Sequence, residues 1–255
     1  MGVWEMLAVL LAGVFAGAVN AVVGSGTLVT FPVLLATGLP PVTATVSNAL
    51  GLVFGSLSGA FGYRRELRGQ GRRVLRFAAG ALCGGFVGAT LLVSLPADTF
   101  ETVVPVLVTL ALVLVILQPR ASAWVRRRRE RQQQPARADG GVLLLVGLTL
   151  ASVYGGYFAA AQGIIYMSLM GVLLDDSMQR LNAVKNVLTA VVNGVAAGFF
   201  LLVAHFDWTA VLLIAVGSVL GGQLGSSVGR RLPPTVLRAA IVVVGATAVV
   251  QMVWP

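Results

Sequence analysis

The chain has 255 residues, of which 57% are hydrophobic and 11% are charged, and its mean hydropathy is +0.91. This composition excludes an ordinary soluble domain and indicates a polytopic membrane protein. The formal net charge of +9 does not indicate nucleic-acid binding, because the arginines lie in loops between apolar segments, where the positive-inside rule explains them.

Several apolar segments are long enough to cross a bilayer, for which about 20 residues are needed. They lie at residues 4–23, 43–63, 74–95, 101–118, 141–161, 181–204, 208–228 and 235–254. Two further apolar segments, 26–37 and 163–174, are too short to cross as helices and predict half-helices or re-entrant pieces. The first segment has no Lys or Arg before it and carries Glu5, so we expect a retained membrane helix rather than a signal peptide.

A polar stretch at 119–140 separates two apolar halves. It contains four consecutive arginines, 126–129, and predicts a flexible cytoplasmic linker. Binding of this run to anionic lipid is the alternative to a plain topology signal. The predicted organisation is a first transmembrane repeat at 1–118, the linker, and a second transmembrane repeat at 141–255.

The two halves resemble each other in sequence. Asn48-Ala49-Leu50 corresponds to Asn182-Ala183-Val184 at an offset of 134 residues. Further on, the offset is 137 residues, and four glycines match four glycines: Gly80, Gly84, Gly85 and Gly88 correspond to Gly217, Gly221, Gly222 and Gly225. The four-residue spacing gives each of these helices a smooth face for tight packing. We infer an internal duplication.

Loop charges indicate that the two repeats are inverted relative to each other. Basic residues place the loop 64–73 and the linker 119–140 in the cytoplasm, whereas the acidic loop 98–101 suits the outside. In the second half the order reverses, since 205–207 suits the outside and the arginines at 230–231 suit the inside. Equivalent loops therefore lie on opposite sides of the membrane.

This topology requires that 4–37 and 141–174 each form a helical hairpin that makes no net crossing. The hairpin tips are expected at Gly24-Ser25-Gly26 and near Ala161-Gln162-Gly163. The predicted fold is all-α, with two inverted repeats that each contain one helical hairpin plus three transmembrane helices. Inverted repeats with re-entrant elements are typical of secondary transporters, which hold their substrate near the midplane.

A polar helix face lies in the second half, around the only lysine of the chain, Lys185. Asn182, Lys185, Asn186, Thr189 and Asn193 follow the spacing i, i+3, i+4, i+7, i+11, which marks one face of an α-helix. An ammonium group at membrane depth costs about 2.5–3.5 kcal/mol on insertion scales, so we expect Lys185 to face a polar pathway or a partner. The alternative is that Lys185 lies near the helix end and snorkels to the interface.

The first hairpin tip combines flexible backbone with the hydroxyl of Ser25 just before a helix start. Helix N-termini bind anions through free N–H groups and the positive end of the dipole. A tight turn that merely needs Gly24 and Gly26 is the alternative. Asn48, as the repeat mate of Asn182, would complete a symmetric pair of amides.

Gln162 marks the second tip and can donate a hydrogen bond through its amide. Tyr154, Tyr157 and Tyr166 are close in sequence, and we expect them to be interfacial anchors rather than ligands. The predicted substrate-binding residues are therefore Lys185, Asn182, Asn186, Asn193, Asn48, Gly24, Ser25, Gly26 and Gln162.

The first repeat carries glycines where the second carries the polar face. Gly51, Gly55 and Gly59 occupy the positions equivalent to Lys185, Thr189 and Asn193. One hypothesis is that the two related helices cross near the centre and that the glycine face leaves room for a small substrate. Close helix packing is the alternative explanation.

Acidic residues are absent from the middle of every apolar segment, which argues against a cation substrate and favours an anion balanced by Lys185. The chain also lacks the paired carboxylates or the Ser/His/Asp set of a membrane hydrolase, so we predict no enzymatic activity and no catalytic residues. With Cys83 and His205 as the one cysteine and the one histidine, we expect no metal site and no cofactor.

Stretches of both halves resemble a known family: Gly24 to Gly26, 31–35, 38–41, Ala44 to Asn48 and 59–63 in the first half, and Arg180 to Asn186, Phe206 to Trp208 and 217–234 in the second. The chain is similar over nearly its whole length to the sulfite exporter TauE/SafE family, also described as the 4-toluene sulfonate uptake permease family. Members of that family often have longer glycine runs at each hairpin, so substrate contacts at the two tips are expected to differ here.

The resemblance implies a multi-pass carrier in the bacterial inner membrane for small sulfur-containing or organic anions such as sulfite, sulfonates or sulfoacetate. We therefore predict a secondary transporter, exporter or permease, and a passive anion channel is the alternative. The expected partners are the small anion and the lipid bilayer. These features are compatible with a homodimer, and we expect no nucleic-acid partner.

Overall fold

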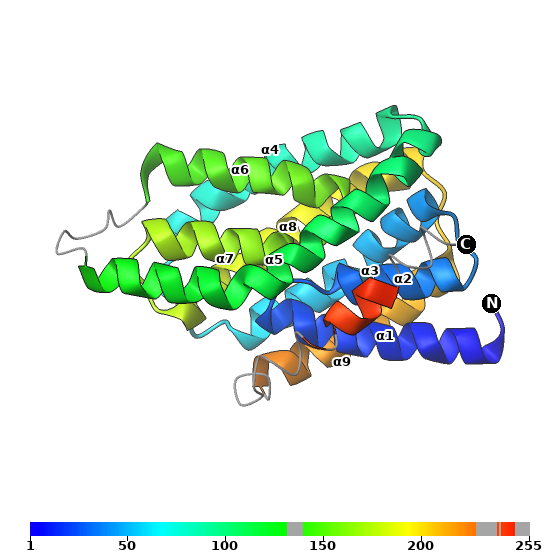
Figure 1. Ribbon diagram of the computed structural model, residues 1–255, viewed down its shortest axis with the longest axis horizontal. Helices are drawn as coiled ribbons and strands as arrows, with labels where there is room; N and C mark the ends of the chain where they lie inside the picture. The colour runs from blue at the N-terminus through cyan, green and yellow to red at the C-terminus, as the bar shows by residue number, and fades with distance from the viewer. Residues whose placement is uncertain (132–139, 228–238, 240, 248–255) are drawn as a thin grey trace.

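The fold is built from helices, as the computed structural model shows (Figure 1). The structure describes residues 1–131, 140–227, 239 and 241–247. The helices are α1 (Val3–Val22), α2 (Thr27–Ala36), α3 (Pro41–Gly62), α4 (Gly71–Ser94), α5 (Ala97–Arg131), α6 (Gly141–Tyr157), α7 (Gln162–Leu173), α8 (Met178–Val203) and α9 (Trp208–Ser227). Six of the helices in these ranges are long and apolar enough to cross a membrane. The predicted all-α polytopic fold is confirmed.

Three described helices are not among these six: α6, which has 17 residues although its segment 141–161 is predicted to cross, and α2 and α7, which are too short to cross. At about 1.5 Å of rise per residue, the 10 residues of α2 and the 12 residues of α7 reach little more than half of a hydrocarbon core. The start of α2 lies directly against α1. A Cβ added at Gly26 would lie only 2.7 Å from the Ala16 carbonyl oxygen, which shows how closely the chain folds back here. The segments 26–37 and 163–174 are therefore half-helices, as predicted. The predicted segment 235–254 lies mostly outside the described residues.

Each half packs the first helix of its hairpin against the second helix that follows the hairpin in the other half. Helix α1 packs on α9, and α6 packs on α4; these two pairs lie along opposite edges of the molecule in Figure 1. The remaining major contacts also come in equivalent pairs, since α3 packs on α9 and α8 packs on α4. The central contact joins the two equivalent helices α3 and α8.

The matched glycines lie in these equivalent contacts. On α9, Gly217 and Gly225 face the α1 backbone, with an added Cβ only 2.5 Å from the Leu10 carbonyl oxygen and 2.6 Å from that of Ala18. On α4, Gly80 faces the side chain of Thr149 on α6, and Gly88 faces the α6 backbone at Val153. The spacing of small residues lets both helix pairs approach closely. The register also shows that α1 runs parallel to α9.

Contacts at the two ends of α8 fix its direction relative to α3. Near the start of α8, the carbonyl oxygen of Arg180 accepts a hydrogen bond from Gln70, which follows the end of α3. After the end of α8, the backbone N–H of Asp207 donates to Ser47 near the start of α3. The equivalent helices α3 and α8 therefore run in opposite directions, which is what inverted repeats require.

Buried apolar side chains form two clusters. The first surrounds the first hairpin, where the ring of Phe31 packs edge-on against that of Phe158 at 5.2 Å between centroids. The second lies between α4, α6, α7 and the first half of α8. Large apolar side chains also face outwards, and Trp4 and Leu202 are each 83% exposed. Such an outer surface suits contact with lipid rather than water.

Two expectations about individual segments are wrong. Helix α5 continues through Pro119 to Arg131, so the first half of the expected flexible linker is helical, while 132–139 lie outside the described residues. The glycine face of α3 leaves no room at Gly51 and Gly55, where an added Cβ would lie 2.7 Å from Ile214 and 2.6 Å from Ser218 of α9. Those two glycines serve helix packing.

Candidate functional site

Lys185 is fully buried in α8, with 0% of its surface exposed. The helix begins at Met178, after Ser177 whose hydroxyl accepts a hydrogen bond from the backbone N–H of Arg180. The ammonium group of Lys185 donates to the carbonyl oxygen of Asn20 at 2.8 Å and to that of Ala21 at 3.2 Å. Snorkelling to the interface is therefore wrong for Lys185, and its partner is the backbone of the first hairpin.

Two asparagines of the same helix face converge on the same end of α1. The side-chain amide of Asn182 donates to the Ala21 carbonyl oxygen at 2.9 Å, and that of Asn186 donates to it at 3.3 Å. The last carbonyl groups of a helix lack partners within the helix and carry its negative dipole end, so they attract positive charge. These carbonyl groups are not among the predicted site residues; the helix end just before Gly24 is the signal that marks them in the sequence.

The two hairpin tips meet beside Lys185. The backbone N–H of Gly163 donates to the Gly24 carbonyl oxygen at 3.1 Å. Gly24 has a φ of 86°, and a Cβ there would lie 2.5 Å from the Cα of Gly163. A Cβ on Gly163 would lie 3.0 Å from the Cδ of Lys185. Glycine is therefore required at this crossing for close approach as well as for the left-handed turn.

Two helix N-termini accompany this crossing, because α2 begins at Thr27 and α7 begins at Gln162. Both short helices thus turn their positive dipole ends towards the centre, in a site that also holds one ammonium group. At the second tip, Ala159 and Ala161 have positive φ values of 64° and 57°. Such backbone costs about 1–2 kcal/mol for alanine, so the second tip holds stored strain of the kind found at functional sites.

Buried polar atoms without a hydrogen-bond partner gather in the same segments. Within the described residues they include Ser25 Oγ of the first tip, Gln162 Oε1 of the second, and Asn182 Oδ1 and Thr189 Oγ1 on the Lys185 face of α8. Buried polar groups are nearly always satisfied, and leaving one unpaired costs about 1–3 kcal/mol. These four atoms therefore suit a polar ligand or ordered water.

Gln162 is held by a short chain of hydrogen bonds within the second hairpin. Its Nε2 donates to the hydroxyl of Tyr166 at 2.6 Å, which lies 2.6 Å from the hydroxyl of Ser152. Ser152 in turn donates to the Leu148 carbonyl oxygen. Tyr166 is 0% exposed, so the expectation of an interfacial anchor is wrong for this tyrosine. The Gln162 amide thus donates within the hairpin rather than to the site, contrary to the expectation, and the atom it leaves free in a defined position is the acceptor Oε1.

Two predicted residues lie away from the lysine. Asn48 joins α3 to the start of α2: its Oδ1 accepts from Thr30 at 2.5 Å, and its Nδ2 donates to Thr27 at 3.2 Å. It therefore braces the first tip rather than forming a symmetric pair with Asn182. Asn193 is buried and lies eight residues after Lys185, about 12 Å further along the helix axis.

Comparison with known proteins finds a family model and several relatives that match nearly the whole chain. The family model for the sulfite exporter TauE/SafE matches residues 9–252. The chain is 25% identical over 254 residues to a probable membrane transporter protein of Haemophilus influenzae, covering 98% of this chain and 95% of that protein. It is 27% identical over 256 residues to the probable membrane transporter protein YfcA of Escherichia coli K12, covering 98% and 92%.

A further relative matches the chain over nearly the same length. The probable membrane transporter protein YdhB of Bacillus subtilis is 24% identical over 244 residues, covering 95% of this chain and 96% of that protein. No solved structure matches the chain significantly. The architecture and the names of the relatives agree on a membrane protein that moves a solute.

Proposed function

Because this chain belongs to the sulfite exporter TauE/SafE family, we propose that it carries a small sulfur-containing or organic anion, such as sulfite, a sulfonate or sulfoacetate. The chain is a multi-pass membrane transporter of the bacterial inner membrane. We propose secondary transport rather than catalysis, with the anion bound near the midplane, where the two hairpin tips meet.

The observation that carries this proposal is the position of Lys185. Among the described residues, Lys185 is the one fully buried side chain that carries a formal charge. It lies beside two helix N-termini. Its two hydrogen bonds to carbonyl groups of α1 leave one N–H of the ammonium group for a ligand. A buried cation with few partners favours an anion over a neutral or cationic substrate.

The arrangement of the halves supports alternating access. The equivalent helices α3 and α8 run in opposite directions, and each half packs mainly on the other through faces of small residues. Because the halves interlock in this way, we propose that movement occurs between packed helix groups, about the central contact of α3 and α8, as inverted-repeat transporters move about a central site. The hairpin tips, Gly24 and Gly163, would then lie at the pivot.

The alternative is a passive anion channel. A channel would be favoured by rings of Arg or Lys along a continuous pore. The described residues instead place one lysine in a closed centre, and its neighbours are amides and hydroxyls. This feature favours a carrier with one binding site.

The proposal is tested by flux into proteoliposomes with sulfite, sulfoacetate and an aryl sulfonate as probes. The parent should move at least one of them and show faster uptake when the same anion is preloaded, as a carrier does. Lys185→Met should abolish this flux, whereas Arg127→Met, which removes an exposed charge from the end of α5, should not. If none of the three anions moves, the proposed substrate class is wrong; if Lys185→Met transports like the parent, the role of Lys185 is wrong.

A further inference from the structure

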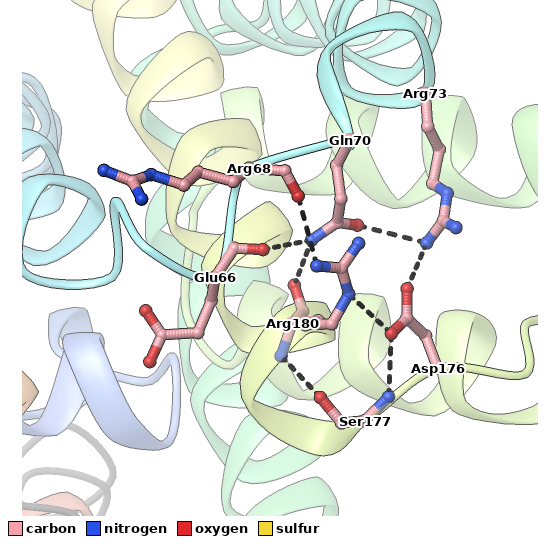
Figure 2. Close-up of polar contacts among 7 residues, drawn as sticks. All are labelled: Glu66, Arg68, Gln70, Arg73, Asp176, Ser177 and Arg180. Atoms are coloured by element: carbon pink, nitrogen blue, oxygen red, sulfur yellow. Dashed lines mark hydrogen bonds and ion pairs between the residues drawn. The ribbon is translucent and has the colours of Figure 1, made fainter.

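A cluster of charged side chains lies at the end of the molecule where α3 ends and α8 begins. Its centre is Asp176, the residue before the cap of α8 (Figure 2). Asp176 Oδ2 accepts from Arg73 Nη1 at 2.8 Å, and its Oδ1 accepts from Arg180 Nε at 2.8 Å. The carboxylate side chain is only 12% exposed. One carboxylate is thus shared between two guanidinium groups.

The cluster joins the two halves of the chain. Arg73 belongs to the first turn of α4 in the first half, whereas Asp176 and Arg180 belong to the second half. Two further hydrogen bonds cross the same boundary: Gln70 Nε2 donates to the Arg180 carbonyl oxygen at 3.3 Å, and Arg180 Nη1 donates to that of Arg68 at 3.2 Å. The side chains of Glu66 and Arg68 turn away from Asp176 in Figure 2.

The opposite end of the molecule has the equivalent contact without the charges. At the repeat offset of 137 residues, Asp207 stands where Gln70 stands in the first half. Its backbone N–H donates to Ser47 at 3.0 Å, and its carboxylate caps α9 through Ala210 N at 2.8 Å. Asp207 makes no ion pair with any described residue. The contact between the two halves therefore includes ion pairs at the Asp176 end and none at the Asp207 end among the described residues, so the Asp176 end is held more strongly.

We propose that Asp176, with Arg73 and Arg180, forms the gate that closes the site at the end bearing the loop 64–73, predicted to be cytoplasmic. This inference rests on the proposed alternating access. Lys185 lies five residues after Arg180, about 7.5 Å further along the axis of α8. Opening at this end, by movement of the start of α4 away from the start of α8, requires the Arg73–Asp176 pair to break, and it would uncover a path to Lys185.

Opening also changes the charge that an approaching anion meets. In the closed state the carboxylate of Asp176 balances part of the positive charge of Arg73 and Arg180. When the start of α4 moves away from the start of α8, Arg73 loses the carboxylate of Asp176 and remains unpaired with it at the mouth of the path. An anion that leaves or enters at this end then passes a guanidinium group that can bind it transiently. The gate residues thus stabilise the closed state and guide the anion in the open one.

Thiol labelling tests the gate without knowledge of the substrate. In a Cys83→Ser background, Thr189→Cys places one thiol on the Lys185 face, where the parent side chain is 5% exposed. A membrane-impermeant methanethiosulfonate is added to inside-out and to right-side-out vesicles. Asp176→Asn should raise the labelling rate about tenfold from the side of the loop 64–73 and should not raise it from the other side.

Arg73→Gln removes the other partner of the Arg73–Asp176 ion pair. It should raise the labelling rate from the same side as Asp176→Asn does. It also replaces Asp176→Asn if that variant does not fold. Asp175→Asn is the matched control, because Asp175 is an exposed neighbour outside the cluster, and its labelling rate should equal the parent rate. Equal rates in the parent and both gate variants, or faster labelling from the opposite side, would overturn the gate. Failure of all anion flux with one-sided labelling intact would instead refute the proposed substrate.

Discussion

The ammonium nitrogen of Lys185 lies 2.8 Å from the carbonyl oxygen of Asn20, so a charged side chain of α8 in the second half caps the last turn of α1 in the first. The hydrogen bond couples the conformation of the first hairpin to the protonated state of one side chain and to whatever binds that side chain. An anion that binds the remaining N–H of Lys185 shares the ammonium group with the helix end and weakens the attraction between them. Ligand binding and movement of the hairpin are therefore linked in this arrangement.

Tyr166→Phe should reduce transport by raising the KM more than it lowers the maximal rate, because Gln162 loses the hydroxyl that orients its amide. The loss also leaves Ser152 without that partner and should destabilise the protein by about 1–2 kcal/mol. Uptake kinetics and thermal unfolding in detergent measure the two effects.

Tyr154→Phe is the matched control for that substitution. The hydroxyl of Tyr154 is buried and has no hydrogen-bond partner among the described residues, so its removal should leave stability unchanged or slightly improved. A loss of stability in this variant equal to that of Tyr166→Phe would contradict the role given to the Gln162–Tyr166 chain.

Gly163→Ala should strongly impair both folding and transport, since its Cβ would lie 2.5 Å from the Cα of Gly24 and 3.0 Å from Lys185. Backbone cannot move away as a flexible side chain can, so the two tips would have to separate. Gly194→Ala on α8 is the control, because a Cβ there meets nothing within 4 Å and alanine favours a helix by about 1 kcal/mol. Similar melting temperatures for the two variants would show that the tips do not meet as described.

Asp176 should make the stability of the folded protein dependent on pH. Burial alone would raise the pKa of its carboxyl group, but hydrogen bonds from Arg73 and from the Ser177 backbone, with the charges of Arg180 and Arg73, outweigh it and hold the pKa below its ordinary value. A lowered pKa stabilises the folded protein at pH values above that of a free aspartate, and this contribution is lost as the pH falls through the pKa of Asp176.

The difference in melting temperature between the parent and Asp176→Asn measures this contribution. It should be constant near neutral pH and shrink as the solution becomes acidic. Asp175→Asn gives the matching charge change at an exposed position, and its difference from the parent should be small throughout the series. A difference for Asp176→Asn that grows in acid would show that the ion pairs do not stabilise the folded state.

Hydropathy predicted most of the helices because it depends on local composition. Segment lengths alone identified the half-helices α2 and α7, since 10 and 12 residues cannot cross a bilayer. The matched glycines predicted close packing but not their partners. That α9 packs on α1 of the other half depends on tertiary arrangement, which no single-chain periodicity encodes. Pro119 did not end α5.

The site was predictable only in part. The spacing around Lys185 correctly placed Asn182 and Asn186 with it, because one helix face brings them together. Repeat symmetry predicted the wrong partner for Asn48, which forms hydrogen bonds with Thr27 and Thr30. The backbone carbonyl groups of Asn20 and Ala21 had no signal of their own, since every residue carries such a group. Their role follows from where the first helix ends.

The most direct measurement is equilibrium binding of a radiolabelled transported anion to the purified protein in detergent, for the parent and for Lys185→Met. The parent should bind the anion, and the variant should bind it at least about tenfold more weakly, which corresponds to about 1.4 kcal/mol. Arg127→Met should bind like the parent. Equal affinity of the parent and Lys185→Met would contradict the central claim that the buried lysine holds the anion.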